Sequence, residues 1–144
     1  MVRFKNRYFT TEIIPLDNGH DVLKTYDILK SVLAVTEQIH GEFGAAAIRN
    51  GLEVKYCNES TQVAIIRCRH GPHRLLASSL PFLSRIGKRK VQLQSMYTGA
   101  TLVKCYHFLK KFHQEKMNEA LKMCRTEQEK KKVLEIMSKT KYGL

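Results

Sequence analysis

Basic side chains at alternate positions give this sequence its clearest chemistry. Arg3, Lys5 and Arg7 alternate with other residues, and so do Arg67 and Arg69. On a β-strand, alternate residues project to one face about 7 Å apart, close to the phosphate spacing of an extended nucleic-acid backbone. Guanidinium groups bind phosphate oxygens through paired hydrogen bonds. The spacing therefore predicts two strands that present cations to phosphate groups. For the first strand, the alternative is a merely solvated edge.

An anion site is also predicted where a helix opens. Gly99 permits close approach of a backbone, Thr101 can cap the helix or donate its hydroxyl, and Lys104 follows one turn later. The exposed N–H groups and the positive end of the helix dipole favour negative charge. A plain helix cap is the alternative. A predicted basic loop, Arg85 to Lys90, adds the cations Lys88, Arg89 and Lys90.

The charge of the chain is strongly positive and unevenly distributed. Lys and Arg number 25 against 13 Asp and Glu, a formal net charge of +12. Between Ser60 and Gln114 there are ten Lys or Arg and no acidic residue. We expect these cations to form one continuous surface for a polyanion, RNA or DNA ahead of an acidic membrane. A basic protein tuned only for solubility is the alternative.

Targeting segments are not indicated. The amino terminus alternates charged with apolar residues and has no apolar core of a signal peptide. No apolar run approaches the length of a membrane helix. We expect a soluble intracellular protein with no membrane partner.

Patterns for catalysis or metal binding are not found either. Cys68, His70 and His73 lie close in sequence, but a fourth ligand is not apparent and the spacing differs from that of zinc sites. The chain has no P-loop, zincin, nucleophile-elbow or dinucleotide motif. We predict no catalytic residue, metal or cofactor in the chain, and expect any Mg²⁺ to be held by bound RNA. An acylphosphatase-like enzyme, with Arg7 gripping phosphate and Asn58 orienting water, is the alternative.

The elements that position these residues follow from hydrophobic periodicity. The pattern predicts strands at about 3–14, 52–56, 62–69 and 91–97, and helices at about 25–40, 73–83, 101–123 and 126–138. The order strand–helix–strand–strand–helix–strand predicts an α/β fold, an α+β sandwich with a ferredoxin-like, RRM-like antiparallel sheet, helices on one face and additional C-terminal helices. We expect one RNA-binding domain over residues 1–124 and a helical extension over 125–144.

Two details of these elements matter for the site. Gly41 stands where the first helix should end, and Phe43 is expected to anchor the small residues that follow as the chain passes into the next strand. The aromatic signature of an RNA-recognition motif is missing from the strand at 62–69. Base stacking across the sheet is therefore not expected, and contact should involve RNA backbone and shape.

Several of these residues form a recognisable series. The most specific piece is the opening Met-Val-Arg-Phe-Lys-x-Arg-Tyr at residues 1–8. The supporting pieces are His40-Gly-x-Phe-Gly-Ala-Ala-Ala47, Gly51-x-x-Val-x-Tyr56-x-Asn58, Arg67-Cys-Arg69, Leu80-Pro-Phe82 and Gly99-x-Thr101. In this order and spacing, the chain resembles the Pop-five type protein subunit of ribonuclease P and ribonuclease MRP over about residues 1–124.

The resemblance implies a non-catalytic subunit of a nuclear, largely nucleolar ribonucleoprotein whose RNA carries the catalytic centre. It implies precursor tRNA, cut at its 5′ end, and precursor ribosomal RNA as substrates, and a TIM-barrel-like protein subunit as direct partner among others. It places Arg3, Lys5, Arg7 and Tyr8 against the RNA, with Arg67 and Arg69 nearby. Ala100, where relatives often have a second glycine, and the missing acidic tail are departures. A general RNA-binding or ribosomal protein is the alternative.

Overall fold

The computed structural model describes residues 3–17, 23–58 and 61–139. The elements are β1 (Asn6–Pro15), α1 (Thr25–Arg49), β2 (Glu53–Asn58), β3 (Val63–Arg69), α2 (His73–Ser79), a 3-10 turn η1 (Leu80–Phe82), β4 (Arg85–Ile86), β5 (Arg89–Gly99), α3 (Leu102–Met123) and α4 (Glu127–Lys139).

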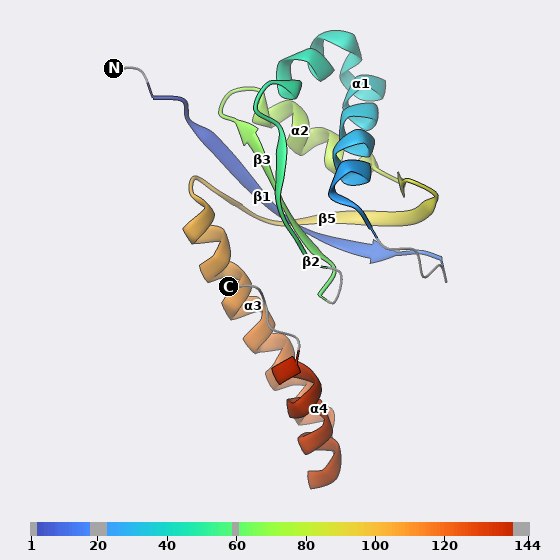
Figure 1. Cartoon of the computed structure of the whole chain (residues 1–144), viewed down its shortest axis with the longest axis vertical. Coiled ribbons are helices and arrows are strands. Elements are labelled where there is room, and N and C mark those ends of the chain that lie inside the picture. The colour runs from blue at the N-terminus through green and yellow to red at the C-terminus, as the bar shows by residue number, and fades with distance from the viewer. Residues whose placement is uncertain (1–2, 18–22, 59–60, 140–144) are drawn as a thin grey trace. The chain divides into compact units, whose positions relative to one another are not determined.

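The strands form one antiparallel sheet in the order β2-β3-β1-β5-β4. Helices α1 and α2 lie together over one face of this sheet (Figure 1). Without the two-residue β4, the strand order is that of a ferredoxin-like fold. The predicted fold class, including the additional C-terminal helices, is confirmed.

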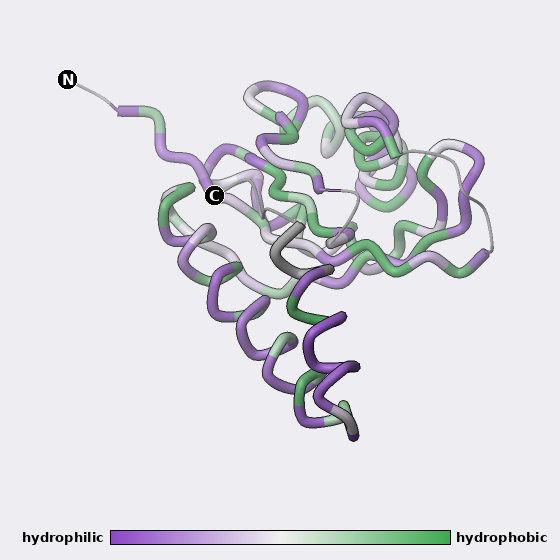
Figure 2. Tube along the Cα trace, turned by 60° about the horizontal axis from the view of Figure 1, so that its bottom comes forward, coloured by the Kyte–Doolittle hydropathy of each residue, from purple (hydrophilic) through white to green (hydrophobic). Residues whose placement is uncertain are grey.

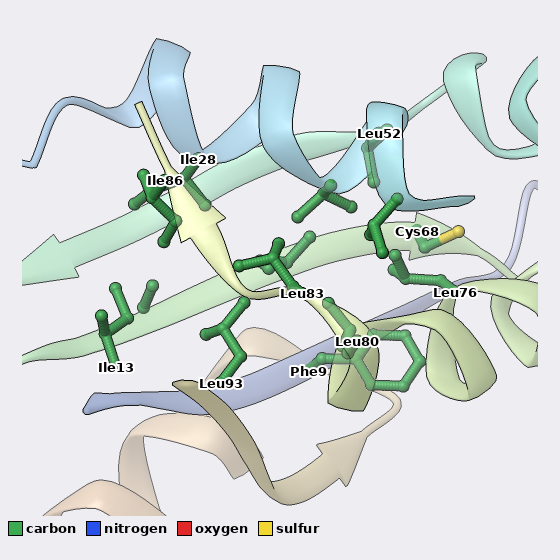
Figure 3. Close-up of a cluster of buried hydrophobic side chains, with 14 of the residues drawn as sticks. Phe9, Ile13, Ile28, Leu52, Cys68, Leu76, Leu80, Leu83, Ile86 and Leu93 are labelled. Atoms are coloured by element: carbon green, nitrogen blue, oxygen red, sulfur yellow. The ribbon is translucent and has the colours of Figure 1, made fainter. Parts of the chain in front are cut away.

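The core lies between the sheet and the two helices (Figure 3). Phe9 and Ile13 alternate along β1 toward this face, and Ile28 and Val32 recur at helical spacing along α1. Leu80 completes the layer from the turn after α2. Burying one such side chain contributes about 1.5–3 kcal/mol, so this layer fixes which face of each strand points away from the helices.

Strand β3 is apolar on both faces, as its sequence predicted for a central strand. Val63, Ala64, Ile65 and Ile66 are all fully buried, and β3 lies between β2 and β1. Ala64 and Ile66 belong to the core under the helices. Residues of the opposite parity, including Arg67 and Arg69, therefore point to the other face of the sheet.

The end of α1 differs from the prediction. Gly41 has φ of 75° and ψ of −173°, which interrupts the helix, but a second helical segment continues to Arg49. This segment buries Ala45 and Ile48, and that burial favours resuming the helix after the kink. Phe43 is 84% exposed, so the expectation that it anchors the segment is wrong.

The predicted basic loop is a short hairpin. Arg85 lies opposite Lys90 and Ile86 opposite Arg89, while Gly87 takes a positive φ of 60° at the turn. Ile86 is buried in the core. A single anchoring residue leaves no periodic signal, which is why the sequence indicated only a loop.

The chain divides into two compact units, one ending at Cys105 and one beginning at Tyr106. In the second unit, the predicted break between the last two helices is confirmed, and Thr126 caps α4. Its hydroxyl accepts the Glu129 N–H at 3.3 Å, and the Glu129 carboxylate accepts the Arg125 N–H at 3.1 Å. The described helices include none with the length and apolarity needed to cross a membrane.

Candidate nucleic-acid interface

Predicted phosphate-binding residues from three separate segments lie around the start of β1, on both faces of the sheet: Arg7 shares the parity of Phe9 on the helix-covered face, whereas Arg67 and Arg69 point to the other face. Tyr8 lies opposite Arg67 on β3 and opposite Gly99 on β5. The segment that leads into β1 is largely hydrophilic (Figure 2). We call this set the amino-end cluster; it comprises Arg3, Lys5, Arg7, Tyr8, Arg67, Arg69, Gly99, Thr101 and Lys104.

The first three cations are not arranged as a strand face. Strand β1 begins at Asn6, so the parity prediction does not hold for Arg3 and Lys5. The reason is that β3 ends at Arg69, opposite Asn6, and offers no strand partner beyond it. The backbone at Lys5 is still held beside the end of β3, because the His70 N–H donates to the Lys5 carbonyl at 2.8 Å.

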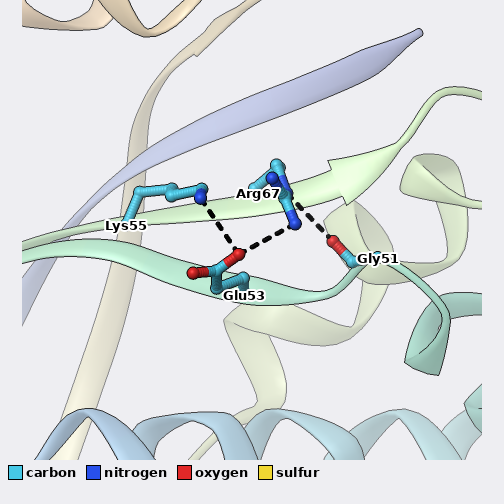
Figure 4. A network of polar contacts seen from close by, with 4 residues as sticks. All are labelled: Gly51, Glu53, Lys55 and Arg67. Atoms are coloured by element: carbon cyan, nitrogen blue, oxygen red, sulfur yellow. Dashed lines mark hydrogen bonds and ion pairs between the residues drawn. The ribbon is translucent and has the colours of Figure 1, made fainter. Parts of the chain in front are cut away.

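Arg67 is held by other groups of the sheet (Figure 4). Its guanidinium lies 2.8 Å from the Glu53 carboxylate and donates to the Gly51 carbonyl at 3.2 Å. Lys55 lies 3.0 Å from the same carboxylate. The hydrogen bond from Lys55, with the positive charges of Lys55 and Arg67, keeps the pKa of Glu53 below its usual value. Glu53 therefore offsets part of the positive charge on this side of the cluster.

The Arg69 side chain packs against Gly51 and against the ring of Phe4. Gly51 has φ of 83°, and a Cβ there would lie 2.8 Å from the Arg69 Nε and 2.9 Å from its Cγ. The Arg69 guanidinium carbon lies 4.2 Å from the centre of the Phe4 ring, within the range of a cation–π contact. Because Gly51 has no side chain, the Arg69 side chain can occupy this space.

Three residues near Arg7, namely His70, His73 and Arg74, were not predicted as part of the interface. The rings of His70 and His73 stack with centroids 4.9 Å apart, and the Gly71 N–H donates to His73 Nδ1 at 2.9 Å. Burial, followed by the positive charges of His70, Arg7 and Arg74, lowers the pKa of His73. The lowered pKa favours the neutral form of His73, and Arg74 is the residue that continues the positive charge of Arg7 onto the start of α2. The run of basic residues directly after β3 was the available signal.

The opening of α3 supports the plain-cap interpretation. The Thr101 hydroxyl accepts the Lys104 N–H at 3.4 Å. Gly99 is buried, and a Cβ there would lie 2.9 Å from the Tyr97 ring and 3.1 Å from the Cys105 sulfur. The space beside Gly99 is thus filled by the chain's own side chains, and an anion contact at this loop stays a prediction.

Cys105 attaches the same opening to β1. Its thiol donates to the Tyr8 carbonyl at 3.6 Å. Burial raises the pKa of this thiol, which keeps its proton available for donation. Lys104, next in sequence, is thereby held near Tyr8.

Three predicted residues, Lys88, Arg89 and Lys90, lie elsewhere; we call them the hairpin cluster. The Leu16 N–H donates to the Lys90 carbonyl at 2.9 Å, and Arg89 lies 3.5 Å from Asp17. This end of β1 is seven residues from Tyr8, about 23 Å at the rise of a β-strand. The expectation of one continuous cationic surface is therefore wrong, because the register of β1 and β5 separates the two clusters.

The geometry also argues against the enzymatic alternative, in which Arg7 and Asn58 act together. Arg7 lies opposite Cys68, whereas Asn58 lies opposite Val63. Five positions along β3 correspond to about 17 Å, too far for both to act on one phosphate. Among the described residues, no three His, Cys, Asp or Glu side chains are grouped to hold a metal ion.

Comparison with known proteins extends the resemblance seen in the sequence. Residues 7–110 match the Rpp14/Pop5 family. The chain belongs to this family. It is 30% identical to the ribonuclease P/MRP protein subunit POP5 of Bos taurus, over 97% of this chain and 85% of that protein. It is 31% identical to the subunit of the same name from Danio rerio, over 92% and 83% of the two chains.

A solved structure shares the fold. A chain in the cryo-EM structure of yeast ribonuclease MRP superposes with a TM-score of 0.52 at 14% identity, covering 83% of this chain and 96% of that one. The Rpp14/Pop5 match includes the hairpin cluster and all of the amino-end cluster except Arg3 and Lys5.

Proposed function

We propose that this chain is a POP5-type protein subunit of ribonuclease P and ribonuclease MRP, and that it binds the RNA of the particle through its amino-end cluster. The carrying observation is the family match together with relatives of that one name, which the chain matches over more than four fifths of their length. A general RNA-binding or ribosomal protein is not favoured by these matches.

The amino-end cluster suits RNA backbone better than RNA sequence. Arg3 and Lys5 are exposed, Arg7 adds a third cation, and Arg74 extends the charge onto α2. Cations grouped in this way neutralise several phosphates at once and release their counterions. The hairpin cluster, about 23 Å away, is a second and separate contact for RNA phosphates.

In this proposal the RNA supplies the catalytic centre and holds the Mg²⁺, while the protein stabilises the RNA. The absence of carboxylates between Ser60 and Gln114 suits a chain that leaves metal binding to its partner. The substrates are precursor tRNA, cut at its 5′ end, and precursor ribosomal RNA. The particle is nuclear and nucleolar, and a TIM-barrel-like protein subunit lies beside this chain.

The identity is tested by purifying the tagged protein from cells and sequencing the RNA that accompanies it. We expect the ribonuclease P and MRP RNAs, and cleavage of precursor tRNA by the purified particle. Recovery of ribosomal RNA with whole ribosomes, without a small ribonucleoprotein and without this cleavage, contradicts the proposal.

The interface is tested by two triple variants of equal charge. Replacing Arg3, Lys5 and Arg7 by alanine should reduce the slope of log affinity against log salt by about 2 to 3, since each lost phosphate contact contributes about 0.7 to 0.9. The second variant replaces Arg85, Lys88 and Lys90, at the other end of β1, by alanine. An unchanged slope in the first variant would exclude the amino-end cluster as the contact.

A further inference from the structure

Phe4 is an aromatic side chain placed among cations at the start of the described chain. Its ring is 74% exposed, although full exposure of a large apolar ring to water is unfavourable. The Arg69 guanidinium covers one face at 4.2 Å from the ring centre. Arg3 and Lys5 are its neighbours in sequence.

The ring is held in place from two sides. Arg69, which packs on the ring, lies in the space that a Cβ at Gly51 would fill. The backbone one residue after Phe4 is fixed by the hydrogen bond from the His70 N–H to the Lys5 carbonyl. A ring positioned before binding loses little conformational freedom when a partner arrives, which increases affinity.

The surrounding charge distinguishes this ring from the exposed ring of Phe43. No acidic residue precedes Glu12 in the sequence, whereas Phe43, 84% exposed, follows Glu42 directly. A planar apolar surface with cations on both sides suits an unpaired nucleotide. In such an arrangement a ring can stack on the base while the cations bind the flanking phosphates.

We propose that Phe4 stacks on an unpaired base of the bound RNA, with Arg69 on the opposite face of the ring and with Arg3 and Lys5 on the neighbouring phosphates. The inference rests on the proposed function, since it assumes that the amino-end cluster binds RNA. The stacking residue precedes the sheet, so it is independent of the aromatic strand signature that this chain lacks. Every base has a face of this kind, and the contact is therefore tolerant of sequence.

The test uses the full chain and two RNA probes: the particle RNA, and a single-stranded RNA carrying 2-aminopurine, whose fluorescence is quenched by stacking. We expect Phe4→Ala to weaken binding about 10-fold, the range typical for loss of one base–aromatic stack. The salt slope should stay unchanged, because no charge is removed, and the quenching should disappear.

Two variants serve as controls. Phe4→Tyr keeps the ring and should bind within about twofold of the unmodified chain, because any aromatic face supports stacking. Phe43→Ala removes a ring outside the cluster that is even more exposed than Phe4 and should leave affinity unchanged. Melting temperatures of all variants check that the fold is intact.

The outcomes separate this inference from the function beneath it. If the unmodified chain shows no salt-dependent RNA binding, both fail. If the unmodified chain binds RNA with a steep salt slope and Phe4→Ala binds equally well, only the proposed stacking contact is wrong. The exposed ring would then contact a protein partner instead. A flattened salt slope in Phe4→Ala also overturns stacking, since the ring would then act by positioning Arg69.

Discussion

Replacing Gly51 by alanine should destabilise the fold by about 2 kcal/mol and displace Arg69. The φ of 83° lies in the left-handed region, where an L-residue costs about 1–2 kcal/mol. The new Cβ would lie 2.8 Å from the Arg69 Nε and 2.9 Å from its Cγ. Moving Arg69 off its preferred rotamer adds about 0.5–1.5 kcal/mol. This cost is smaller if the long side chain can adopt another staggered rotamer.

The assay is thermal and urea denaturation of the purified chain. For a protein of this length, 1 kcal/mol corresponds to about 4 °C in melting temperature. Gly51→Ala should therefore melt about 8 °C below the unmodified protein. RNA binding should weaken as well, because Arg69 can no longer support the Phe4 ring.

A double-mutant cycle separates the two parts of the cost. In an Arg69→Ala background the contact with the new Cβ is gone, so Gly51→Ala should then cost only the backbone part, about 1–2 kcal/mol. The reasoning is refuted if Gly51→Ala leaves the melting temperature within about 1 °C of the unmodified chain, or if the two substitutions simply add.

Three further predictions concern the charge, the pH dependence and the core. Glu53→Gln should increase RNA affinity and steepen the salt slope by nearly one unit, since it releases Arg67 and Lys55; Glu37→Gln on α1 is the control of equal charge, and equal effects of the two argue against a local release. Acidification should lower the melting temperature between pH 6.5 and the lowered pKa of His73, because the unfolded chain binds more protons in that window; His73→Gln should show a weaker dependence, and parallel curves contradict this assignment. Leu80→Ala should cost about 2–5 kcal/mol in urea denaturation because Leu80 is fully buried, and a loss below about 1 kcal/mol would mean that the layer closes over the gap.

Local patterns predicted the elements that bury a regular stripe of side chains. The four apolar residues from Val63 to Ile66 identified an interior strand, and Thr126 with Glu129 identified the start of α4. In both cases the deciding interactions lie within a few residues of each other. The strand order then followed from the number and type of elements.

Features that depend on strand register or on distant contacts were not predictable in this way. The sequence predicted that the first strand includes Arg3 and Lys5, but these residues lie beyond the end of the partner strand β3. Only the pairing of Asn6 with Arg69 shows where that end is. The separation of Lys88 from the amino-end cluster depends on where β5 meets β1. The contact of Gly51 with Arg69 joins residues 18 positions apart, and no local pattern records it.

Phe43 shows a different limit. Small residues after Gly41 fit either a closely packed passage into a strand or a continued helix, and the burial of Ala45 and Ile48 decides for the helix. That burial depends on what the second segment of α1 packs against, which the sequence of the segment does not contain.

The outermost strands of the sheet have a consequence for the protein before it meets RNA. Strand β4 pairs only with Arg89 and Lys90 and leaves the rest of β5 as the margin on one side, whereas β2, on the other side, carries Glu53 and Lys55 and shifts register between Val54 and Tyr56. Short, charged or irregular margins of this kind do not template the addition of a strand from another molecule. At its β2 margin, a newly made copy therefore resists joining a neighbour sheet to sheet before the particle is assembled.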